Sequence, residues 1–381
     1  MAEWKEYTLG ELLQYEQPTA YIVKSTDYND NYKTPVLTAG KTFILGYTNE
    51  RQGVYDELPV IIFDDFTTAS QYVNFKFKVK SSAMKILKAN TGLVLPKFVF
   101  YRMQIIKFDA STHKRYWIQH YSKIKVKIPP TISEQEHIIS CIEELFSQLD
   151  ASVAELKTAK ERLKVYRQAV LKEAFEGDYP QVQLKEISTA ISGYAFKSKL
   201  YTSDGKYIVV KIGNVKERHF EFSRDLTRTN EADETILDKY LLQRGDCLIT
   251  LTGSRGKRDY GFVTMIKDQT NYLLNQRVAA IRFNRKEAIP EFFQYYLASP
   301  SYRSAFFRYE TGNVGQGNVG IKALTEPIVI LPNIEQQWRI VEEIESRLSV
   351  CDSIEKTVDT ALQQAEALRQ SILKKAFKGG F

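Results

Sequence analysis

Two long segments stand out in the pattern of hydrophobic and polar positions. Through 131–177 and again through 333–381, apolar residues recur at alternating steps of three and four. This 3.5-residue period is typical of a coiled-coil seam rather than of the wider apolar face of a core helix. The predicted seam positions are Ile142, Leu145, Leu149, Leu156, Ala159, Leu163, Tyr166 and Val170, and then Ile344, Cys351, Ile354, Val358, Ala361, Ala365, Leu368 and Ile372. Each helix of about 45 residues would be about 65 Å long.

The two helical segments are copies of one repeat. When the chain is shifted by 202 residues, 129–150 aligns with 331–352 without a gap, and 166–177 aligns with 368–379. Two unrelated surface helices could share a heptad period, but they would not share polar identities in one ungapped register. The polar identities include Gln135/Gln337, Arg167/Arg369 and Lys172/Lys374. We therefore expect a tandem of two half-proteins whose helices pair antiparallel, with one lobe at each end of the rod.

The segments between the helices are rich in predicted strands. Alternating β-branched and aromatic runs indicate strands at 21–25, 58–65, 73–80, 93–103 and 123–129, and at 207–215, 247–253, 260–266, 277–283 and 326–332, with a helix at 290–309. The predicted fold class is α+β: two strand-rich, mixed α/β lobes separated by a pair of long helices in a pseudo-two-fold repeat. The predicted boundaries are 1–130 and 178–332 for the lobes, and 131–177 and 333–381 for the helices.

Composition and charge narrow the function. The length of 381 residues and a hydrophobic share of 43% favour more than one folded unit and exclude a largely disordered chain. No apolar run approaches the roughly 20 residues that span a bilayer, and the N-terminus lacks the apolar region of a signal peptide, so a cytoplasmic protein is expected. Three dispersed Cys and four dispersed His favour neither disulfides nor a metal site.

The positive charge lies in the lobes. Residues 1–128 hold 18 Lys and Arg against 12 Asp and Glu, and residues 178–330 hold 22 against 17, whereas both helical segments are slightly acidic. Basic lobes favour a nucleic-acid partner.

Polar, basic loops flanked by glycine occur in both lobes and are candidate DNA contacts. Glycine lets the backbone approach closely, and Lys, Arg, Ser, Asn and Gln bind phosphates or base edges. The candidates in the first lobe are Lys41, Thr42, Lys80, Ser81, Ser82 and Lys85. The candidates in the second lobe are Thr252, Ser254, Arg255, Lys257, Arg258, Asn275, Gln276, Arg277, Asn313, Gln316 and Asn318. For any single residue, a solvated turn is an equally good interpretation.

Familiar catalytic motifs are absent from the sequence. There is no G-x-x-x-x-G-K-[ST] phosphate loop, no G-x-G-x-x-G after a strand, no Asn-Pro-Pro-aromatic tetrapeptide and no G-x-S-x-G elbow. The run FDDF at 63–66, followed by Lys76 and Lys78, faintly resembles a nuclease carboxylate–lysine pattern. Paired acids at a strand end are more often structural residues.

The sequence resembles the specificity subunit of a Type I restriction–modification system. The resemblance rests on the helix starts PPTISEQEHII and LPNIEQQWRIV, on the helix ends RQAVLKEAFEG and RQSILKKAFKG, and on runs such as PVLTAGKTFILGYTNERQGVY and RGDCLITLTGSRG. It covers essentially the whole chain. It implies two target-recognition domains, each reading one half of a bipartite, asymmetric DNA target, with the coiled coil setting the unread spacer.

The resemblance also implies partners. The chain itself would be non-catalytic and bind no cofactor. It would recruit two methyltransferase subunits, which use S-adenosylmethionine, and motor–nuclease subunits, which use ATP and Mg. Residues repeated in both helices, namely Gln135, Arg167, Lys172, Gln337, Arg369 and Lys374, are the candidate docking residues, with packing inside the chain as an equal alternative. Competing hypotheses are a two-lobed DNA-binding regulator without methylation partners and an enzyme with an unrecognised site.

Overall fold

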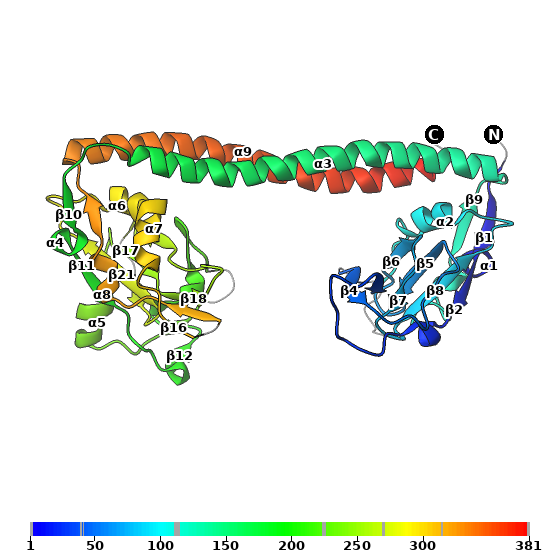
Figure 1. Cartoon of the computed structure of the whole chain (residues 1–381), viewed down its shortest axis with the longest axis horizontal. Helices are drawn as coiled ribbons and strands as arrows, with labels where there is room; N and C mark the ends of the chain where they lie inside the picture. Colours follow the sequence, from blue (N-terminus) through cyan, green and yellow to red (C-terminus); the bar gives the residue numbers. More distant parts are fainter. Residues whose placement is uncertain are drawn as a thin grey trace. The chain divides into compact units, whose positions relative to one another are not determined.

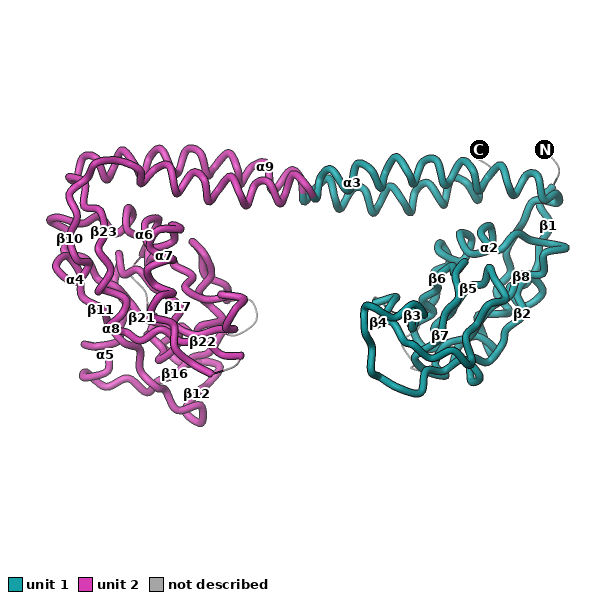
Figure 2. The backbone as a smooth tube through the Cα atoms, in the orientation of Figure 1, with its two compact units in different colours: residues 1–157, 359–381 teal, residues 158–358 magenta. Residues whose placement is uncertain are grey.

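The chain forms two compact units (Figure 2). The computed structural model describes residues 3–38, 40, 42–109, 115–222, 226–268, 271–313 and 315–378. Unit 1 consists of residues 1–157 and 359–381, and unit 2 of residues 158–358. Two helices of 43 residues each, α3 (Ile132–Ala174) and α9 (Ile334–Ala376), contribute to both units. Each unit therefore contains one lobe and a part of each long helix.

The lobe of unit 1 is built on an antiparallel sheet of order β2-β8-β5-β6. A smaller sheet, β4-β3-β7, includes the parallel pair β3–β7, and β1 pairs with β9 (Figure 1). Its elements are β1 (Lys5–Thr8), α1 (Leu9–Leu12), β2 (Leu13–Glu16), β3 (Thr34–Leu37), β4 (Ile44–Thr48), β5 (Val60–Asp64), β6 (Ser70–Val73), β7 (Lys78–Val79), β8 (Met84–Ala89), α2 (Pro96–Met103) and β9 (Lys125–Ile128), with 3-10 turns at Pro18–Tyr21 and Tyr121–Lys123.

The lobe of unit 2 repeats this plan and adds to it. Its main sheet is β11-β21-β17-β19, and β10 pairs with β23 as β1 pairs with β9. Its elements are β10 (Gln181–Gln183), α4 (Leu184–Ile187), β11 (Ser188–Ser192), β12 (Tyr201–Thr202), β13 (Tyr207–Val210), β14 (Val215–Lys216), β15 (His219–Phe220), β16 (Arg228–Thr229), α5 (Glu234–Tyr240), β17 (Cys247–Thr250), β18 (Thr252–Ser254), β19 (Val263–Met265), β20 (Tyr272–Leu274), β21 (Val278–Phe283), α6 (Pro290–Ala298), α7 (Pro300–Phe307), β22 (Gln316–Asn318), α8 (Lys322–Thr325) and β23 (Ile328–Ile330), with 3-10 turns at Ser198–Leu200 and Ile212–Asn214.

The second sheet of unit 2, β12-β16-β13-β20, corresponds to β4-β3-β7 of unit 1 and has one strand more, β12. The hairpin β14–β15 and the ribbon β18–β22 are two-stranded additions. Because these elements lie between strands of the shared plan, the two lobes have the same frame and different loops.

The long helices begin at equivalent caps. The Thr131 hydroxyl accepts a hydrogen bond from the backbone N–H of Glu134, and the Asn333 side chain accepts one from the backbone N–H of Gln336. The same N–H group of the first turn, which has no partner within the helix, is therefore satisfied in both repeats. In unit 2, ion pairs join Arg347 to Glu173 at 2.9 Å and Lys160 to Glu355 at 3.6 Å. The numbering falls along α3 as it rises along α9, so the helices run antiparallel.

Each lobe shares one hydrophobic core with the helices beside it. In unit 1 the core takes Ile138, Ile142 and Phe146 from α3, Ile372, Leu373 and Ala376 from α9, and Phe377 directly after α9. In unit 2 it takes the equivalent residues of the repeat: Ile340, Ile344 and Leu348 from α9, Val170, Leu171 and Ala174 from α3, and Phe175 directly after α3. Burying a side chain such as Ile142 or Ile344 contributes about 1.5–3 kcal/mol. The predicted fold class, two strand-rich lobes joined by paired long helices, is confirmed.

Two predicted strands were wrong. The run 93–103 contains the helix α2, because Pro96 stands at its first turn and Phe98, Val99 and Met103 put one apolar face into the core. Residues 21–25 lie outside any named strand, after the 3-10 turn Pro18–Tyr21. The predicted helix at 290–309 is present as two helices, α6 and α7, which are separated by Ser299; Pro300 is the first residue of α7.

Candidate nucleic-acid interface

Two of the polar loops predicted in the second lobe meet in one ribbon. The strand β18 pairs antiparallel with β22, which sets Thr252 opposite Asn318 and Ser254 opposite Gln316. Gly253 lies opposite Gly317 between them, and a Cβ on Gly317 would meet the Tyr260 hydroxyl oxygen at 2.6 Å. The two loops are therefore one continuous polar surface, although more than 50 residues separate them in sequence.

The turn after β18 is held by its own side chains. Asp259 accepts hydrogen bonds from the backbone N–H of Ser254 at 2.6 Å and from its hydroxyl at 3.0 Å. The backbone bond, and then the hydroxyl bond, lower the pKa of Asp259. Arg255 donates to the carbonyl of Gly312 at 2.8 Å, which ties the turn to the segment before β22. These contacts stabilise the turn that presents Lys257.

Arg258 and Arg303 sit over one aromatic ring. Their guanidinium carbons lie 4.9 and 5.2 Å from the centre of the Phe307 ring. Arg303 also donates to the carbonyls of Gly261 and Tyr260, so it supports the far side of the turn. Sequence reasoning missed Arg303, because its role depends on a fold contact some 40 residues away.

The third predicted loop of this lobe joins the same region. The N–H of Leu251 donates to the carbonyl of Arg277 at 3.0 Å, and the N–H of Val319 donates to the carbonyl of Leu251 at 2.9 Å. Arg277 and Gln276 are exposed, and Asn275 is half-buried. Gly193 allows the backbone to approach, since a Cβ there would meet the carbonyl oxygen of Asn275 at 2.0 Å. The structure thus gathers the three loops around β18.

In unit 1 the two predicted loops also meet. The strand β7 pairs with β3, and the N–H of Lys80 donates to the carbonyl of Leu37 at 3.1 Å. The hydroxyl of Thr38 donates to the carbonyl of Thr42 at 2.7 Å, which closes the β3–β4 hairpin. The ammonium of Lys80 lies 5.9 Å from the centre of the Tyr28 ring. Lys41 lies outside the described residues.

Lys85 has a different environment from the other candidates. Its side chain is buried, and its ammonium lies 3.3 Å from a carboxylate oxygen of Asp65, which is also buried. The other oxygen of Asp65 accepts the backbone N–H of Trp117 at 2.8 Å. The pair therefore lies inside the lobe, where it holds the segment around Trp117, and Lys85 is not part of the surface that the loops form.

The carboxylates of the nuclease-like run have structural partners. Asp64 accepts the N–H groups of Phe66 and Thr67, and Asp65 pairs with Lys85. Lys78 is buried and lies 3.1 Å from Glu50. Within the described parts of the chain, no group of three His, Cys, Asp or Glu could hold a metal ion.

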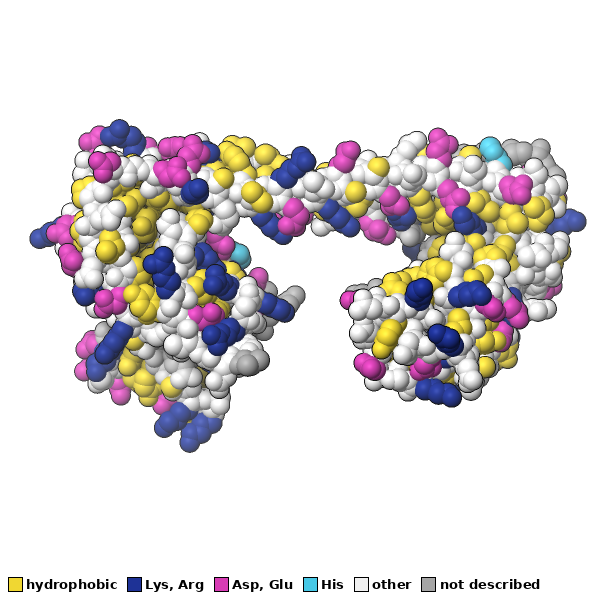
Figure 3. Space-filling model, viewed as in Figure 1, with side chains coloured by type: hydrophobic (Ala, Val, Ile, Leu, Met, Phe, Trp, Pro, Cys, Tyr) yellow, Lys and Arg dark blue, Asp and Glu magenta, His cyan; other side chains and the backbone are white. Residues whose placement is uncertain are grey.

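Most remaining candidates are available on the surface. Ser81, Thr252 and Ser254 are half-buried. The exposed candidates are Thr42, Lys80, Ser82, Arg255, Lys257, Arg258, Gln276, Arg277, Asn313, Gln316 and Asn318. In the view of Figure 3, Lys and Arg side chains are spread over the visible face of each lobe, with acidic side chains between them.

The repeated glutamines are anchors between helix and lobe. Gln135 is buried, accepts the N–H of Leu95 at 2.8 Å and donates to the carbonyl of Leu93 at 3.0 Å. Gln337 is buried, accepts the N–H of Ile289 at 2.8 Å and donates to the carbonyl of Glu287 at 2.8 Å. Both glutamines also donate to the carbonyl of a proline before their own helix. Both side chains are thus used inside the chain.

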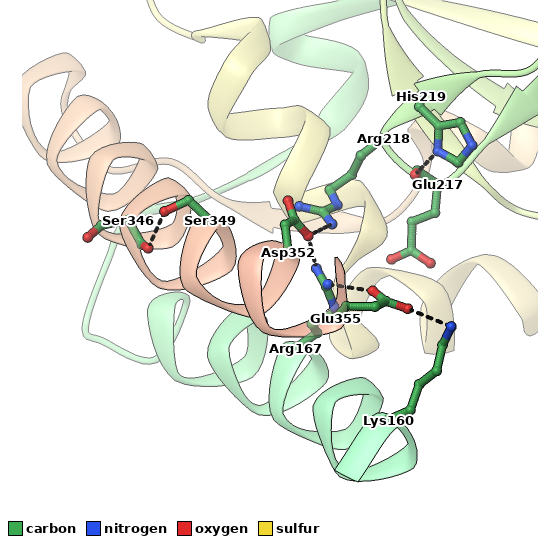
Figure 4. A network of polar contacts seen from close by, with 9 residues as sticks. All are labelled: Lys160, Arg167, Glu217, Arg218, His219, Ser346, Ser349, Asp352 and Glu355. Carbon is green, nitrogen blue, oxygen red and sulfur yellow. Dashed lines mark hydrogen bonds and ion pairs between the residues drawn. The ribbon is translucent and has the colours of Figure 1, made fainter. Parts of the chain in front are cut away.

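The repeated arginines join the two long helices. Arg167 of α3 binds Asp352 of α9 at 2.5 Å, and the equivalent Arg369 of α9 binds Asp150 of α3. In unit 2, Arg167 also binds Glu355 at 2.8 Å, and Arg218 of the lobe reaches Asp352 at 3.5 Å (Figure 4). The partly exposed pairs are worth modest energies individually, but they fix the register of the helices.

Lys172 and Lys374 differ from the other repeated residues. Both are exposed, and Lys172 makes only a long i,i+4 contact of 3.9 Å to Glu176. Of the six candidate docking residues, these two therefore present their side chains at the surface.

In the described part of the chain, no helix is both long enough and apolar enough to cross a membrane.

Comparison with known proteins gives consistent matches. A family model described as Type I restriction modification DNA specificity domain matches residues 1–161 and 176–364. The Type I restriction enzyme EcoR124I/EcoR124II specificity subunit of Escherichia coli is 44% identical over 180 residues, which is 44% of this chain and 44% of that protein. The EcoKI specificity subunit of Escherichia coli (strain K12) is 29% identical over 277 residues, 68% of this chain and 58% of that protein. The matches span about half the length of these curated relatives.

Solved structures match over nearly the full chain. A chain from a structural study of complex assembly and conformational transition of the type I R-M system aligns with a TM-score of 0.73 and 17% identity, over 99% of this chain and 98% of that chain. The crystal structure of the HsdS subunit from Thermoanaerobacter tengcongensis aligns with a TM-score of 0.50 and 18% identity, over 99% and 97%. These matches show that the fold is shared.

Proposed function

Since this chain belongs to the Type I restriction modification DNA specificity domain family, we propose that it is the DNA-recognition subunit of a Type I restriction–modification complex. Each lobe reads one half of a bipartite target, and the α3–α9 pair sets the unread spacer between the halves. The chain carries out no chemistry itself and binds no cofactor. Methyltransferase subunits with S-adenosylmethionine and motor–nuclease subunits with ATP and Mg supply the chemistry, in the bacterial cytoplasm.

One observation carries this proposal: the same frame is built twice and bears two different loop sets. Both lobes have equivalent main sheets and equivalent glutamine anchors, whereas the ribbon β18–β22 and the hairpin β14–β15 occur only in unit 2 among the described residues. Identical loops would suit a symmetric target. Different loops on the same frame suit two half-targets of different sequence that are joined in one site.

The loop surfaces have the chemistry that DNA recognition requires. Lys257 and Arg258 in unit 2, and Lys80 in unit 1, are exposed cations suited to phosphates. Gln276, Gln316 and Asn318 are exposed amides, the side chains that pair with adenine edges in the major groove. The loops therefore combine positioning groups with groups that discriminate bases.

The long helices offer equivalent surfaces for two copies of one partner. Lys172 and Lys374 are exposed at equivalent positions, and so are the apolar side chains of Tyr166 and Leu368, with 45% and 50% of their surface exposed. Exposed apolar side chains on a helix pair favour the docking of further helices. We assign these surfaces to the two methyltransferase subunits.

Methylation mapping tests the proposed function. The chain is expressed with the methyltransferase encoded beside it, and genomic adenine methylation is mapped by single-molecule sequencing, with the methyltransferase alone as the control. We expect methylation at one bipartite motif, present only when this chain is present. Absence of chain-dependent methylation from a folded, co-purifying complex would refute the proposal and favour the DNA-binding regulator.

A further inference from the structure

One groove occurs twice in the chain, once in each unit, where the lobe meets the long helices. In unit 1 its volume is about 630 Å³. Its wall combines aromatic and charged side chains: Phe100 and Tyr101 of α2, Glu143, Phe146 and Asp150 of α3, and Arg369 of α9. Among the described residues, the lobe of unit 1 contributes to this wall Phe100 and Tyr101 of α2 and Gln104, which directly follows α2.

The equivalent groove in unit 2 is divided. Equivalent helix residues, including Leu348, Asp352 and Arg167, line two separate cavities of about 480 and 420 Å³. Tyr295 of α6 stands where unit 1 has Tyr101, and their hydroxyls donate to the equivalent Glu345 and Glu143 at 3.3 and 3.4 Å. The two grooves thus share their helix residues and their tyrosine.

The tip of the β14–β15 hairpin divides the unit 2 groove. Glu217, Arg218 and His219 line both cavities, and Arg218 points from the tip toward Asp352, with a nitrogen 3.5 Å from its carboxylate (Figure 4). Arg218 adopts a φ of 65°, a left-handed conformation that a non-glycine residue rarely takes. The N–H of Arg218 donates to the carbonyl of Val263 at 2.8 Å, which fixes the tip on β19. An arginine-bearing turn from the chain itself therefore crosses this groove and leaves a cavity on each side.

The undivided groove in unit 1 has features that suit an arginine from outside the chain. Glu366 lies in its wall where unit 2 has Lys164, and Phe100 replaces Gln294. Glu143 pairs with Lys97 and Asp150 with Arg369, just as Asp352 of unit 2 pairs with Arg167 and also with Arg218. Carboxylates attract a guanidinium and aromatic faces stabilise it, whereas the same carboxylates repel nucleic-acid phosphates. The occupant that fits is an arginine on a protein loop.

We propose that the unit 1 groove is the docking site for a loop of a partner protein that presents an arginine side chain, in the way that Arg218 occupies the groove of unit 2. The inference deepens the proposed function and rests on it in one respect, because a methyltransferase subunit is the expected bearer of the loop. It makes the two docking surfaces unequal: one is completed by the chain itself and the other by the partner.

A peptide titration tests the groove without methyltransferase or DNA. The probe is a fluorescent cyclic peptide with the sequence of residues 213–222, which includes the hairpin tip, and the target is the complete chain. We expect saturable binding that weakens at least tenfold when the arginine of the peptide is alanine. The Ser147→Arg variant, which places a guanidinium in the groove from an exposed helix position, should weaken binding at least tenfold as well.

The matched control is Ser349→Arg, the same change at the equivalent position of unit 2. It adds the same charge to the chain and should leave peptide binding unchanged. Thermal unfolding of both variants verifies their folds. No saturable binding, or equal binding to the wild-type chain and the Ser147→Arg variant, would overturn the proposal.

The partner is tested by titrating the methyltransferase subunit into the same three chains. We expect Ser147→Arg to weaken one of the two binding events at least tenfold and Ser349→Arg to weaken neither to that extent. Equal binding to wild type and Ser147→Arg would overturn the docking proposal. A methyltransferase that fails to bind the wild-type chain would instead count against the proposed function. The peptide titration would still show whether the groove binds an arginine-bearing loop.

Discussion

At the scale of single residues, the repeated polar identities act mostly inside the molecule. Gln135 and Gln337 hold lobe backbone, and Arg167 and Arg369 hold the opposite helix. The sequence indicated that these residues have the same role in both repeats, because they recur in one ungapped register. It could not show what they contact, since a buried anchor and an exposed docking residue give the same repeat.

Loss of one anchor should destabilise its unit. In Gln135→Ala, the N–H of Leu95 and the carbonyl of Leu93 lose their buried partner, which is expected to cost roughly 3 kcal/mol. Urea unfolding followed by tryptophan fluorescence, to which buried Trp117 of the same core contributes, measures the change. Gln148→Ala, at an exposed position of the same helix, is the control and should unfold like the wild type. Coincident midpoints for all three chains would contradict the anchor role.

Lys85 shows the limit of reading cations from sequence. It follows a polar stretch beside exposed Lys80 and Ser82, and that pattern favours a surface role. In the fold it is the second residue of β8 and faces Asp65. The FDDF run held a signal for this pair, because a buried carboxylate at a strand end, such as Asp65, requires a cation or a hydrogen-bond donor beside it.

At the scale of elements, the loops predicted separately become one surface when the strands pair. The polar composition of 252–258 and 313–318 was evident from sequence, but their meeting depends on the β18–β22 register. Helix α2 was mistaken for a strand because its run of apolar and aromatic residues fits either period, and Pro96 was the signal that separated them. The extents of the long helices were predicted well, because their period continues over many turns, whereas the predicted seam positions Tyr166, Ile354 and Leu368 are exposed.

The ribbon should supply electrostatic affinity for DNA. We expect Lys257→Ala to weaken binding to specific and unrelated duplexes alike, and to reduce the slope of log affinity against log salt by about 1, as loss of one phosphate contact does. Binding titrations over a range of salt concentrations measure both effects. Lys239→Ala, an exposed lysine on α5, is the control and should keep the wild-type slope. A slope unchanged by Lys257→Ala would remove this residue from the interface.

At the scale of the whole molecule, the repeat gives both long helices the same interval between their cross-helix ion pairs. Asp150 and Arg167 on α3, and Asp352 and Arg369 on α9, are each 17 residues apart. An equal insertion between them in both helices lengthens the intervening segments and keeps each ion pair with its own unit. The tandem could be predicted from sequence, whereas the division into units that share the helices required the fold.

One heptad inserted after Asp150 and one after Asp352 should lengthen the DNA spacer. Seven residues add about 10 Å of helix, which corresponds to about three base pairs. We expect methylation mapping to show unchanged half-targets separated by a spacer about three base pairs longer. Insertion of a heptad in α3 alone is the control, because it mismatches the helices and should abolish the specific pattern. Altered half-targets with an unchanged spacer would contradict the role of the helices.

The glutamine anchors have a consequence for how this molecule can change. The hydrogen bonds from each glutamine to its lobe go to main-chain atoms, namely the carbonyl of Leu93 or Glu287 and the N–H of Leu95 or Ile289. These hydrogen bonds do not depend on which side chains the contacted lobe residues carry. A lobe can therefore acquire new residues, or be replaced by another lobe with the same backbone turn, while its attachment to the helix persists. The molecule is built so that what it recognises can evolve without disturbing how it is assembled.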